Sequence, residues 1–350
     1  MKVVAVMALT PGMVLGEDIS FQGKTIYPAG TELNQMMIDK ISRYSIMCAT
    51  VMEGVDLAST HYERIRFDED FKLFEQKYNA ALMRYKALMC SFLQTGTPIP
   101  DDMLLQIYED TYANIRSGAV LLDYLYNKMP NEDELTFSHC LNSALLAGAI
   151  ADWINMTEED KRNLILCGFY YDIGKLMLPY ELLWKSEKLT PEEYKQIQTH
   201  PVVGYSLIRA LPLDNHVKNA VIMHHERLDG SGYPYHMKGQ KIDVFARYIA
   251  IVDAYIAMAS SRSYRMAFTP LQILGNFEQD MTKFDTELLL SVMKRIADAQ
   301  IGSRIQTNDG RVWEVILIHP HKLSRPVLKN DDNQLLDLCE YPELEITKMM

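Results

Sequence analysis

The residues with the clearest potential for chemistry form the stretch Met223–Pro234, Met-His-His-Glu-Arg-Leu-Asp-Gly-Ser-Gly-Tyr-Pro. Two adjacent histidines, His224 and His225, end an apolar run and are followed by an acidic turn with two glycines. Histidine is the commonest protein metal ligand and titrates near neutral pH, while glycine lets the backbone turn tightly or approach a ligand closely. The stretch therefore predicts a metal site at a helix end. A surface turn with two solvated histidines is the alternative that this short motif leaves open.

Other residues able to bind metals lie before and after this stretch. Asp172 belongs to the sequence Tyr-Asp-Ile-Gly-Lys at 171–175, His139 precedes it, His200 lies between the two stretches, and Asp253 follows them. Each lies near an expected helix end or on an apolar helical face, where a buried polar group needs a partner. Any one alone is more typical of a hydrogen-bonded core residue. Histidines and carboxylates can together bind divalent ions, and such ions promote attack on an anionic phosphorus.

The order of these residues resembles the HD-GYP family, the branch of the HD superfamily formed by cyclic di-GMP phosphodiesterases. The resemblance covers roughly residues 131–296, and its most specific part is the HHExxDGxGYP pattern that begins at His224. It implies a phosphodiesterase with two divalent ions, iron or manganese. The metal ligands that it implies, with Asp172 bridging the ions, are His139, Asp172, His200, His224, His225 and Asp253.

The resemblance also implies which residues contact the substrate. Lys175 matches a family lysine that contacts the scissile phosphate, and it shares a helical face with Asp172 because residues three apart are neighbours. These two residues take the catalytic roles. Arg262 and Arg265 match positions that contact the dinucleotide phosphates, a task suited to the forked guanidinium group. Tyr233 is expected to stack on or hydrogen-bond the nucleotide, with a packed turn tyrosine as the alternative.

The chain departs from the family pattern at five positions. Tyr171 replaces a metal-binding histidine, and a phenol with a pKa of about 10 is a far poorer ligand at neutral pH. Leu135 replaces a glutamate that supports a third ion in some members, which argues against a three-metal site. Ile256 and Ser261 stand where aspartate is usual, and Met266 stands where lysine is common. These differences affect catalysis more than fold or ligand recognition.

The composition is that of an ordinary globular protein, with 350 residues, 48% of them hydrophobic and 23% charged. No apolar run approaches the ~20 residues that cross a bilayer, and the first apolar run is too short for a signal peptide. We therefore expect a cytoplasmic protein without a membrane span. The net charge of −11 argues against a long nucleic-acid partner. The five cysteines form no CxxC pair and are expected to be reduced.

Turns and apolar stripes divide the chain into four expected segments with a mainly α fold. Glycine and proline punctuate short strands at the start, which predicts a small α+β module. Apolar residues at three- and four-residue steps then predict a helical connector, whose stripes suit core packing or a homodimer seam. A block without strand signals predicts a helical bundle, and a β-rich tail follows. The expected segments are 1–56, 57–130, 131–298 and 299–350.

Capping residues locate individual helices. Thr190, followed by proline and two glutamates, is expected to begin one helix, and another is expected over residues 213–225. The connector helix that begins at Asp101 is expected to carry Ile115 and Leu122 on one face.

The tail contains two further patterns. The sequence Asn-Asp-Gly at 308–310, between apolar runs, predicts a hairpin turn. His319 and His321 flank a proline without a carboxylate beside them, which favours a solvated loop over a metal site.

Three functions fit these patterns. The leading hypothesis is a metal-dependent phosphodiesterase for cyclic di-GMP. The second is a degenerate HD-GYP domain that senses the dinucleotide or binds a protein partner without turnover, and the third is an HD-type hydrolase for a related nucleotide. Metal content separates the first two, because two ions with activity favour the enzyme and one ion or none with retained binding favours the sensor.

Overall fold

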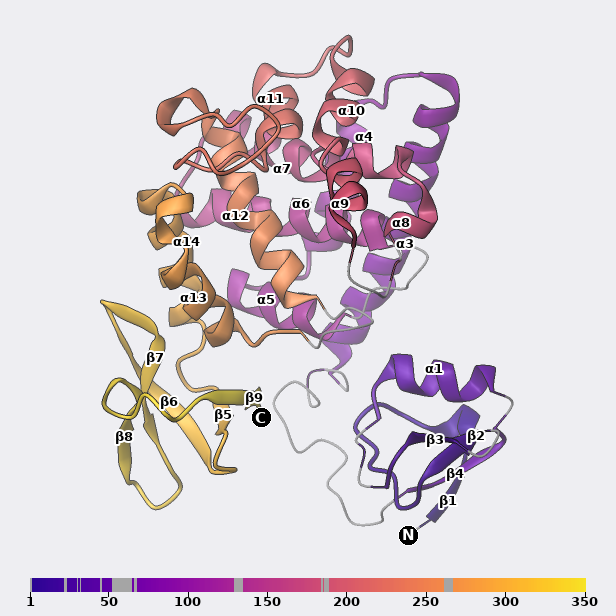
Figure 1. The fold of residues 1–350 in the computed structure, drawn as a ribbon, viewed down its shortest axis with the longest axis vertical. Coiled ribbons are helices and arrows are strands. Elements are labelled where there is room, and N and C mark those ends of the chain that lie inside the picture. The colour runs from indigo at the N-terminus through magenta and orange to yellow at the C-terminus, as the bar shows by residue number, and fades with distance from the viewer. Residues whose placement is uncertain are drawn as a thin grey trace. The chain divides into compact units, whose positions relative to one another are not determined.

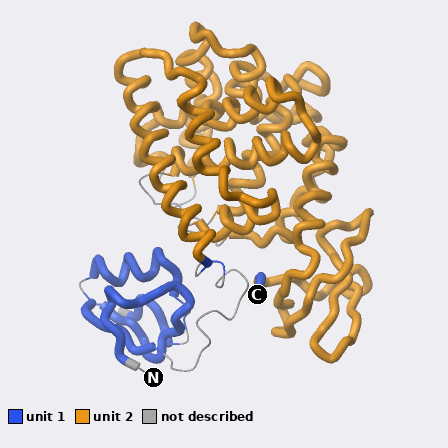
Figure 2. The backbone as a smooth tube through the Cα atoms, turned by 180° about the vertical axis from the view of Figure 1, so that it is seen from behind, with its two compact units in different colours: residues 1–68, 349–350 blue, residues 69–348 orange. Residues whose placement is uncertain are grey.

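The computed structural model describes residues 2–21, 24–29, 31, 33–44, 46–51, 65, 68–128, 135–183, 185, 189–260 and 267–350. The chain forms two compact units, residues 1–68 with 349–350, and residues 69–348 (Figures 1 and 2). Within the described ranges, none of the helices has the length and apolar character needed to span a membrane.

The first unit combines two strand pairs with one helix. Strand β1 (Lys2–Ala5) pairs antiparallel with β4 (Cys48–Val51), and β2 (Ile19–Phe21) with β3 (Lys24–Tyr27). The short helix η1 (Val6–Ala8) follows β1. Helix α1 (Gln35–Arg43) begins after Asn34, whose side chain accepts a hydrogen bond from the Met37 backbone N–H. Apolar side chains from these elements share one core, which confirms the expected α+β module.

The second unit is mainly helical, as expected from the absence of strand signals. Its helices before the C-terminal sheet are α3 (Glu69–Thr95), α4 (Asp101–Tyr112), α5 (Gly118–Asn127), α6 (Leu135–Trp153), α7 (Glu158–Tyr170), η3 (Ile173–Met177), α8 (Tyr180–Leu183), α9 (Pro191–Ile197), α10 (His200–Ile208), α11 (Asn215–Met223), η4 (Gly239–Lys241), α12 (Val244–Ala259), α13 (Pro270–Gln279), η5 (Met281–Lys283) and α14 (Thr286–Asp298).

Helix α6 forms the centre of this bundle. Its residues from 140 to 151 are all buried, because a helix that is apolar on every side is stable only when other elements cover it. Helices α3, α7 and α12 pack against it. The apolar stripe of α3 is also buried within the unit, so it packs in the core of this chain.

Close packing also brings η3 against α10. A Cβ atom at Gly174 would overlap the backbone carbonyl oxygen of His200, so only glycine permits this approach. The contact places the turn that holds Asp172 beside the first residue of α10.

Two expected helices differ in the structure. Helix α4 ends at Tyr112, and Leu122 lies on α5, which begins where the Ser117 side chain accepts a hydrogen bond from a backbone N–H. Ile115 lies between the two helices, so the expected common face was wrong. The helix expected over residues 213–225 is α11, which begins after its cap Asp214 and ends at Met223. The capping box at Thr190 is confirmed.

The last segment forms a five-stranded sheet with the order β8-β7-β6-β5-β9 (Figure 1). The expected turn at residues 308–310 is confirmed, because it joins the antiparallel strands β5 and β6. The sheet packs on α13 through β7. Its strands, and the short helix η6 that follows β8, are β5 (Arg304–Thr307), β6 (Val312–His319), β7 (Lys322–Lys329), β8 (Leu335–Asp337), η6 (Leu338–Glu340) and β9 (Ile346–Met349).

The expectation of a solvated loop fails for one of the two tail histidines. The His319 ring is half-buried, with Nε2 3.0 Å from the Asp337 Oδ1 atom. Asp337 lies on another strand, so the sequence around His319 does not indicate this contact. His321 is exposed, as expected.

Candidate metal centre

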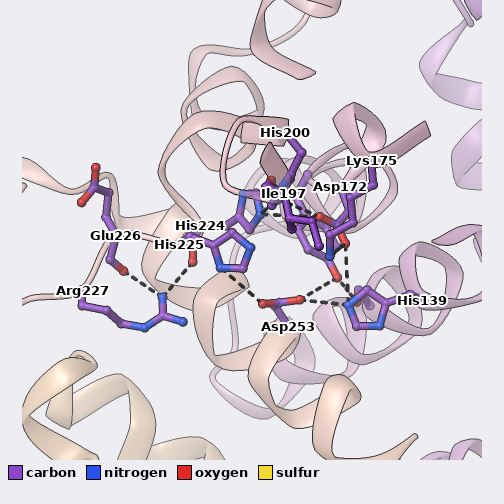
Figure 3. Close-up of polar contacts among 12 residues, drawn as sticks. His139, Asp172, Lys175, Ile197, His200, His224, His225, Glu226, Arg227 and Asp253 are labelled. Carbon is purple, nitrogen blue, oxygen red and sulfur yellow. Dashed lines mark hydrogen bonds and ion pairs between the residues drawn. The ribbon is translucent and has the colours of Figure 1, made fainter. Parts of the chain in front are cut away.

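The six residues expected to bind metals converge in the second unit (Figure 3). Helix ends supply most of them, which explains how residues far apart in the sequence meet. They are His139 in α6, Asp172 at the N-cap of η3, His200 at the start of α10, His224 at the C-cap of α11, His225 after it, and Asp253 in α12.

Four of these residues form a first cluster, which we call the four-ligand position: Asp172, His200, His224 and His225. The Nε2 atoms of His200 and His224 are 3.1 Å apart. The Asp172 Oδ1 atom is 3.2 Å from Nε2 of His200 and 3.7 Å from Nε2 of His224. One ligand atom from each of the four residues lies within 4.8 Å of the others, a spacing that suits ligands of one ion.

The tautomers of two histidines show that this position fits a cation. The His200 Nδ1 atom is 2.7 Å from the Ile197 carbonyl oxygen, and the His224 Nδ1 atom is 3.0 Å from that of Val221. A carbonyl oxygen only accepts, so each Nδ1 carries a proton, and each ring in its neutral form directs a lone pair from Nε2. The buried Asp172 Oδ1 atom has no hydrogen-bond partner among the described residues. Three lone pairs therefore face one another, and a metal ion would satisfy all three.

The electrostatic environment keeps these ligands in the forms that bind metals. Burial lowers the pKa of His200, although the nearby Asp172 partly offsets it. Burial, followed by repulsion from His224, lowers the pKa of His225 well below its ordinary value. Burial acts against ionisation of Asp172, but the nearby Lys175 ammonium group opposes it, and the pKa of the carboxyl group lies well below the usual range. The site thus combines neutral His200 and His225 imidazoles with the Asp172 carboxylate anion.

A second cluster, the three-ligand position, consists of His139, Asp172 and Asp253. The His139 Nε2 atom is 2.9 Å from Asp253 Oδ1 and 3.8 Å from Asp172 Oδ2. The two oxygens of Asp172 thus face different clusters, which is the geometry of a bridging carboxylate. Burial acts against ionisation of Asp253, but the hydrogen bond from His139 outweighs it and lowers the pKa of the carboxyl group.

Tyr171 fills space beside the three-ligand position. Its hydroxyl group donates to Asp253 Oδ1 at 3.3 Å and lies 3.0 Å from the Ser143 Oγ atom. The ring packs edge-on against His224, with centroids 5.0 Å apart. Burial, reinforced by Asp253 and Asp172, raises the pKa of the phenol well above its ordinary value. Tyr171 therefore remains neutral near pH 7 and offers Asp253 a hydrogen bond.

Lys175 lies beside the bridging carboxylate, with its Nζ atom 2.6 Å from Asp172 Oδ2. The expectation of a shared α-helical face needs one correction, because α7 ends at Tyr170 and Lys175 lies in the 3-10 helix η3. The two side chains still meet because a 3-10 helix has three residues per turn.

The remaining expected residues have different surroundings. Tyr233 is half-buried and stacks on His225, with ring centroids 4.6 Å apart. Leu135 begins α6, and Ile256 is buried in α12. Four residues expected at or near the site lie outside the described residues: Arg262, Arg265, Ser261 and Met266.

Two residues that shape the centre were not predicted from the sequence. Ser143 follows His139 by four residues in α6 and therefore shares its helical face, a signal that would have revealed it. Glu226 directly follows the histidine pair, and its buried carboxylate binds backbone N–H groups of the next loop. That role depends on the path of the loop, which the sequence pattern does not indicate.

Comparisons with known proteins agree with this architecture. Residues 121–288 match the family described as HD domain. Cyclic di-GMP phosphodiesterase PA4108 of Pseudomonas aeruginosa is 28% identical over 299 residues, which cover 83% of this chain and 70% of that protein. The cyclic di-GMP phosphodiesterase response regulator RpfG of Xanthomonas campestris is 36% identical over 126 residues, covering 35% of this chain and 33% of that protein.

One solved structure has a similar fold. Bd1817, an HDG"Y"P protein from Bdellovibrio bacteriovorus, matches with a TM-score of 0.50 and 14% identity, covering 84% of this chain and 99% of that chain.

A further sequence relative is the 3'3'-cGAMP-specific phosphodiesterase 1 of Vibrio cholerae, which is 33% identical over 156 residues, covering 45% of this chain and 36% of that protein. This chain thus spans about a third of the length of some relatives.

Proposed function

We propose that the chain is a metal-dependent phosphodiesterase of the HD-GYP type that hydrolyses cyclic di-GMP, which the match of residues 121–288 to the family described as HD domain supports. The observation that carries this proposal is the Asp172 carboxylate, whose two oxygens face two different clusters of metal-binding side chains. A centre of this kind suits phosphodiester hydrolysis, because charge develops on the phosphoryl oxygens during attack and metal ions stabilise it.

The proposed cofactors are two divalent ions, iron or manganese, one at each position. Mixed imidazole and carboxylate ligation suits both metals. When bound, such ions make water a nucleophile near neutral pH and polarise a phosphoryl oxygen. The chain contributes the orientation of the ligands, through the carbonyl oxygens that fix the tautomers of His200 and His224.

Other residues of the chain are proposed to hold the substrate. The Lys175 ammonium group lies at the bridging carboxylate and is partly exposed, so it can contact the scissile phosphate. Tyr233 is proposed to contact the nucleotide with the part of its ring that His225 leaves open. The expected homodimer stays a prediction, and it would need a face of the connector other than the buried stripe of α3.

The proposed phosphate contacts of Arg262 and Arg265 give a first prediction. Replacing both by alanine is expected to weaken cyclic di-GMP binding by about tenfold or more, since a hydrogen bond to a charged group contributes about 1.5–3 kcal/mol. Metal content should not change, because these residues are proposed to touch phosphate only. Calorimetry with metal-loaded protein measures the affinity, and equal affinity of the variant and the parent would disprove the phosphate role.

A dinucleotide sensor without turnover is the second candidate function. The observation that favours it is the Tyr171 hydroxyl, which donates to Asp253 where the family has a metal-binding histidine. Activity toward cyclic di-GMP and 3'3'-cGAMP, followed by chromatography of the products, separates the candidates. Cleavage of cyclic di-GMP supports the proposed enzyme, preferential cleavage of the other dinucleotide supports a related hydrolase, and binding without cleavage supports the sensor.

A further inference from the structure

The Glu226 side chain closes the loop that follows the two adjacent histidines. Its carboxylate is buried, with 2% of the residue exposed. Oε1 accepts a hydrogen bond from the Tyr235 backbone N–H at 2.7 Å, and Oε2 accepts one from that of Met237 at 2.9 Å. Hydrogen bonds to a charged acceptor are stronger than neutral ones. One side chain therefore fixes the backbone nine and eleven residues further along.

These bonds restrain Tyr233 from its C-terminal side, while another bond restrains it from the N-terminal side. The Tyr233 backbone N–H donates to the His225 carbonyl oxygen at 3.1 Å. A Cβ atom at Gly232 would overlap that same oxygen, so the loop lies directly on the backbone of the histidine pair. Between the two restraints, the Tyr233 ring stacks on the His225 ring at an interplanar angle of 27°.

From this chain of contacts we infer that Glu226 is a positioning residue, which sets the orientation of the His225 imidazole through Tyr233. The inference rests on the proposed metal centre, since His225 belongs to the four-ligand position. Glu226 acts without touching the ion, because both of its oxygens bind backbone N–H groups. Groups that orient a metal-binding histidine typically change metal affinity by about 10–100-fold when they are removed.

The test uses Co²⁺ alone, added without oxygen to the metal-free full chain. In Glu226→Gln, an amide NH₂ group replaces one acceptor and opposes a backbone donor. We expect the affinity for the first Co²⁺ to fall by about 10–100-fold and the visible Co²⁺ spectrum to change. Asp229→Asn is the matched control, because Asp229 binds the Ser231 backbone N–H in the same loop but is exposed. This control should leave the affinity and the spectrum unchanged.

A second variant keeps the test decisive if Glu226→Gln does not fold, as melting temperature and circular dichroism will show. Tyr233→Leu removes the ring from His225 while Glu226 stays, and we expect it to change the Co²⁺ spectrum in the same way. An unaltered spectrum in Tyr233→Leu, or an unaltered Co²⁺ affinity in folded Glu226→Gln, overturns the inference. Neither readout requires hydrolysis, so a wild-type chain that binds Co²⁺ without cleaving the dinucleotide would refute only the proposed function.

Discussion

Asp172→Ala is expected to abolish metal loading at both positions and, with it, hydrolysis of cyclic di-GMP. The physical reason is that Asp172 supplies one oxygen to each cluster, 3.2 Å from Nε2 of His200 on one side and 3.8 Å from Nε2 of His139 on the other. Among the described residues, the two clusters contain one further carboxylate, that of Asp253. It belongs only to the three-ligand position, so it does not take the place of Asp172 between the two clusters. Metal analysis of the purified variant measures the effect.

Stability must be followed in the same variant. The substitution removes the partner 2.6 Å from the Lys175 ammonium group, and removal of one member of a buried ion pair costs about 3–5 kcal/mol. Asp172→Asn keeps the shape of the side chain but lacks the charge, so it serves as the folded control and is also expected to lose metal. Retention of both ions in these two variants would show that Asp172 does not bridge them.

Tyr171→His is expected to raise metal occupancy of the three-ligand position and the rate of hydrolysis together. A neutral imidazole coordinates near pH 7, whereas the buried phenol keeps its proton because its pKa is raised well above the ordinary value. The new ring would also end the hydrogen bond that the hydroxyl group donates to Asp253. We expect the affinity for the second ion to rise about tenfold or more, which corresponds to ~1.4 kcal/mol.

Tyr171→Phe is the matched control, because it keeps the ring and removes the same hydrogen bond without adding a ligand. Its metal content should remain that of the parent chain. The smaller histidine ring should cost roughly 1 kcal/mol of stability, a value typical of point substitutions. If the tyrosine is itself a ligand or covers one ion, Tyr171→His would lower both metal content and activity, and the tyrosine would not be what limits the site.

The sequence predicted the helical class of the second unit because its apolar patterns and capping residues act locally. The Thr190 capping box and the turn at residues 308–310 both formed where expected. The division of one connector helix into α4 and α5 was missed, because the apolar period continues through Ile115 and Leu122 while Ser117 begins a new helix. A local cap therefore outweighed a longer periodic signal.

The pairing of particular atoms at the metal centre required the structure. The order of the motifs indicated which residues meet, but the direction of a lone pair depends on backbone carbonyl groups such as that of Ile197. The hydrogen bond between Ser143 and Tyr171 joins residues 28 positions apart, and Glu226 reaches over nine residues to the backbone of Tyr235. Such contacts depend on how the elements pack, which spacing in the sequence does not specify.

The most direct test of the proposed function is a joint measurement on the wild-type chain purified without oxygen: its metal content and its conversion of cyclic di-GMP, followed by chromatography. The proposed enzyme predicts two ions of iron or manganese per chain, and cleavage that stops on chelation and returns when the metal is restored. A fully metal-loaded chain that binds cyclic di-GMP and leaves it intact would contradict the proposal and identify the domain as a sensor.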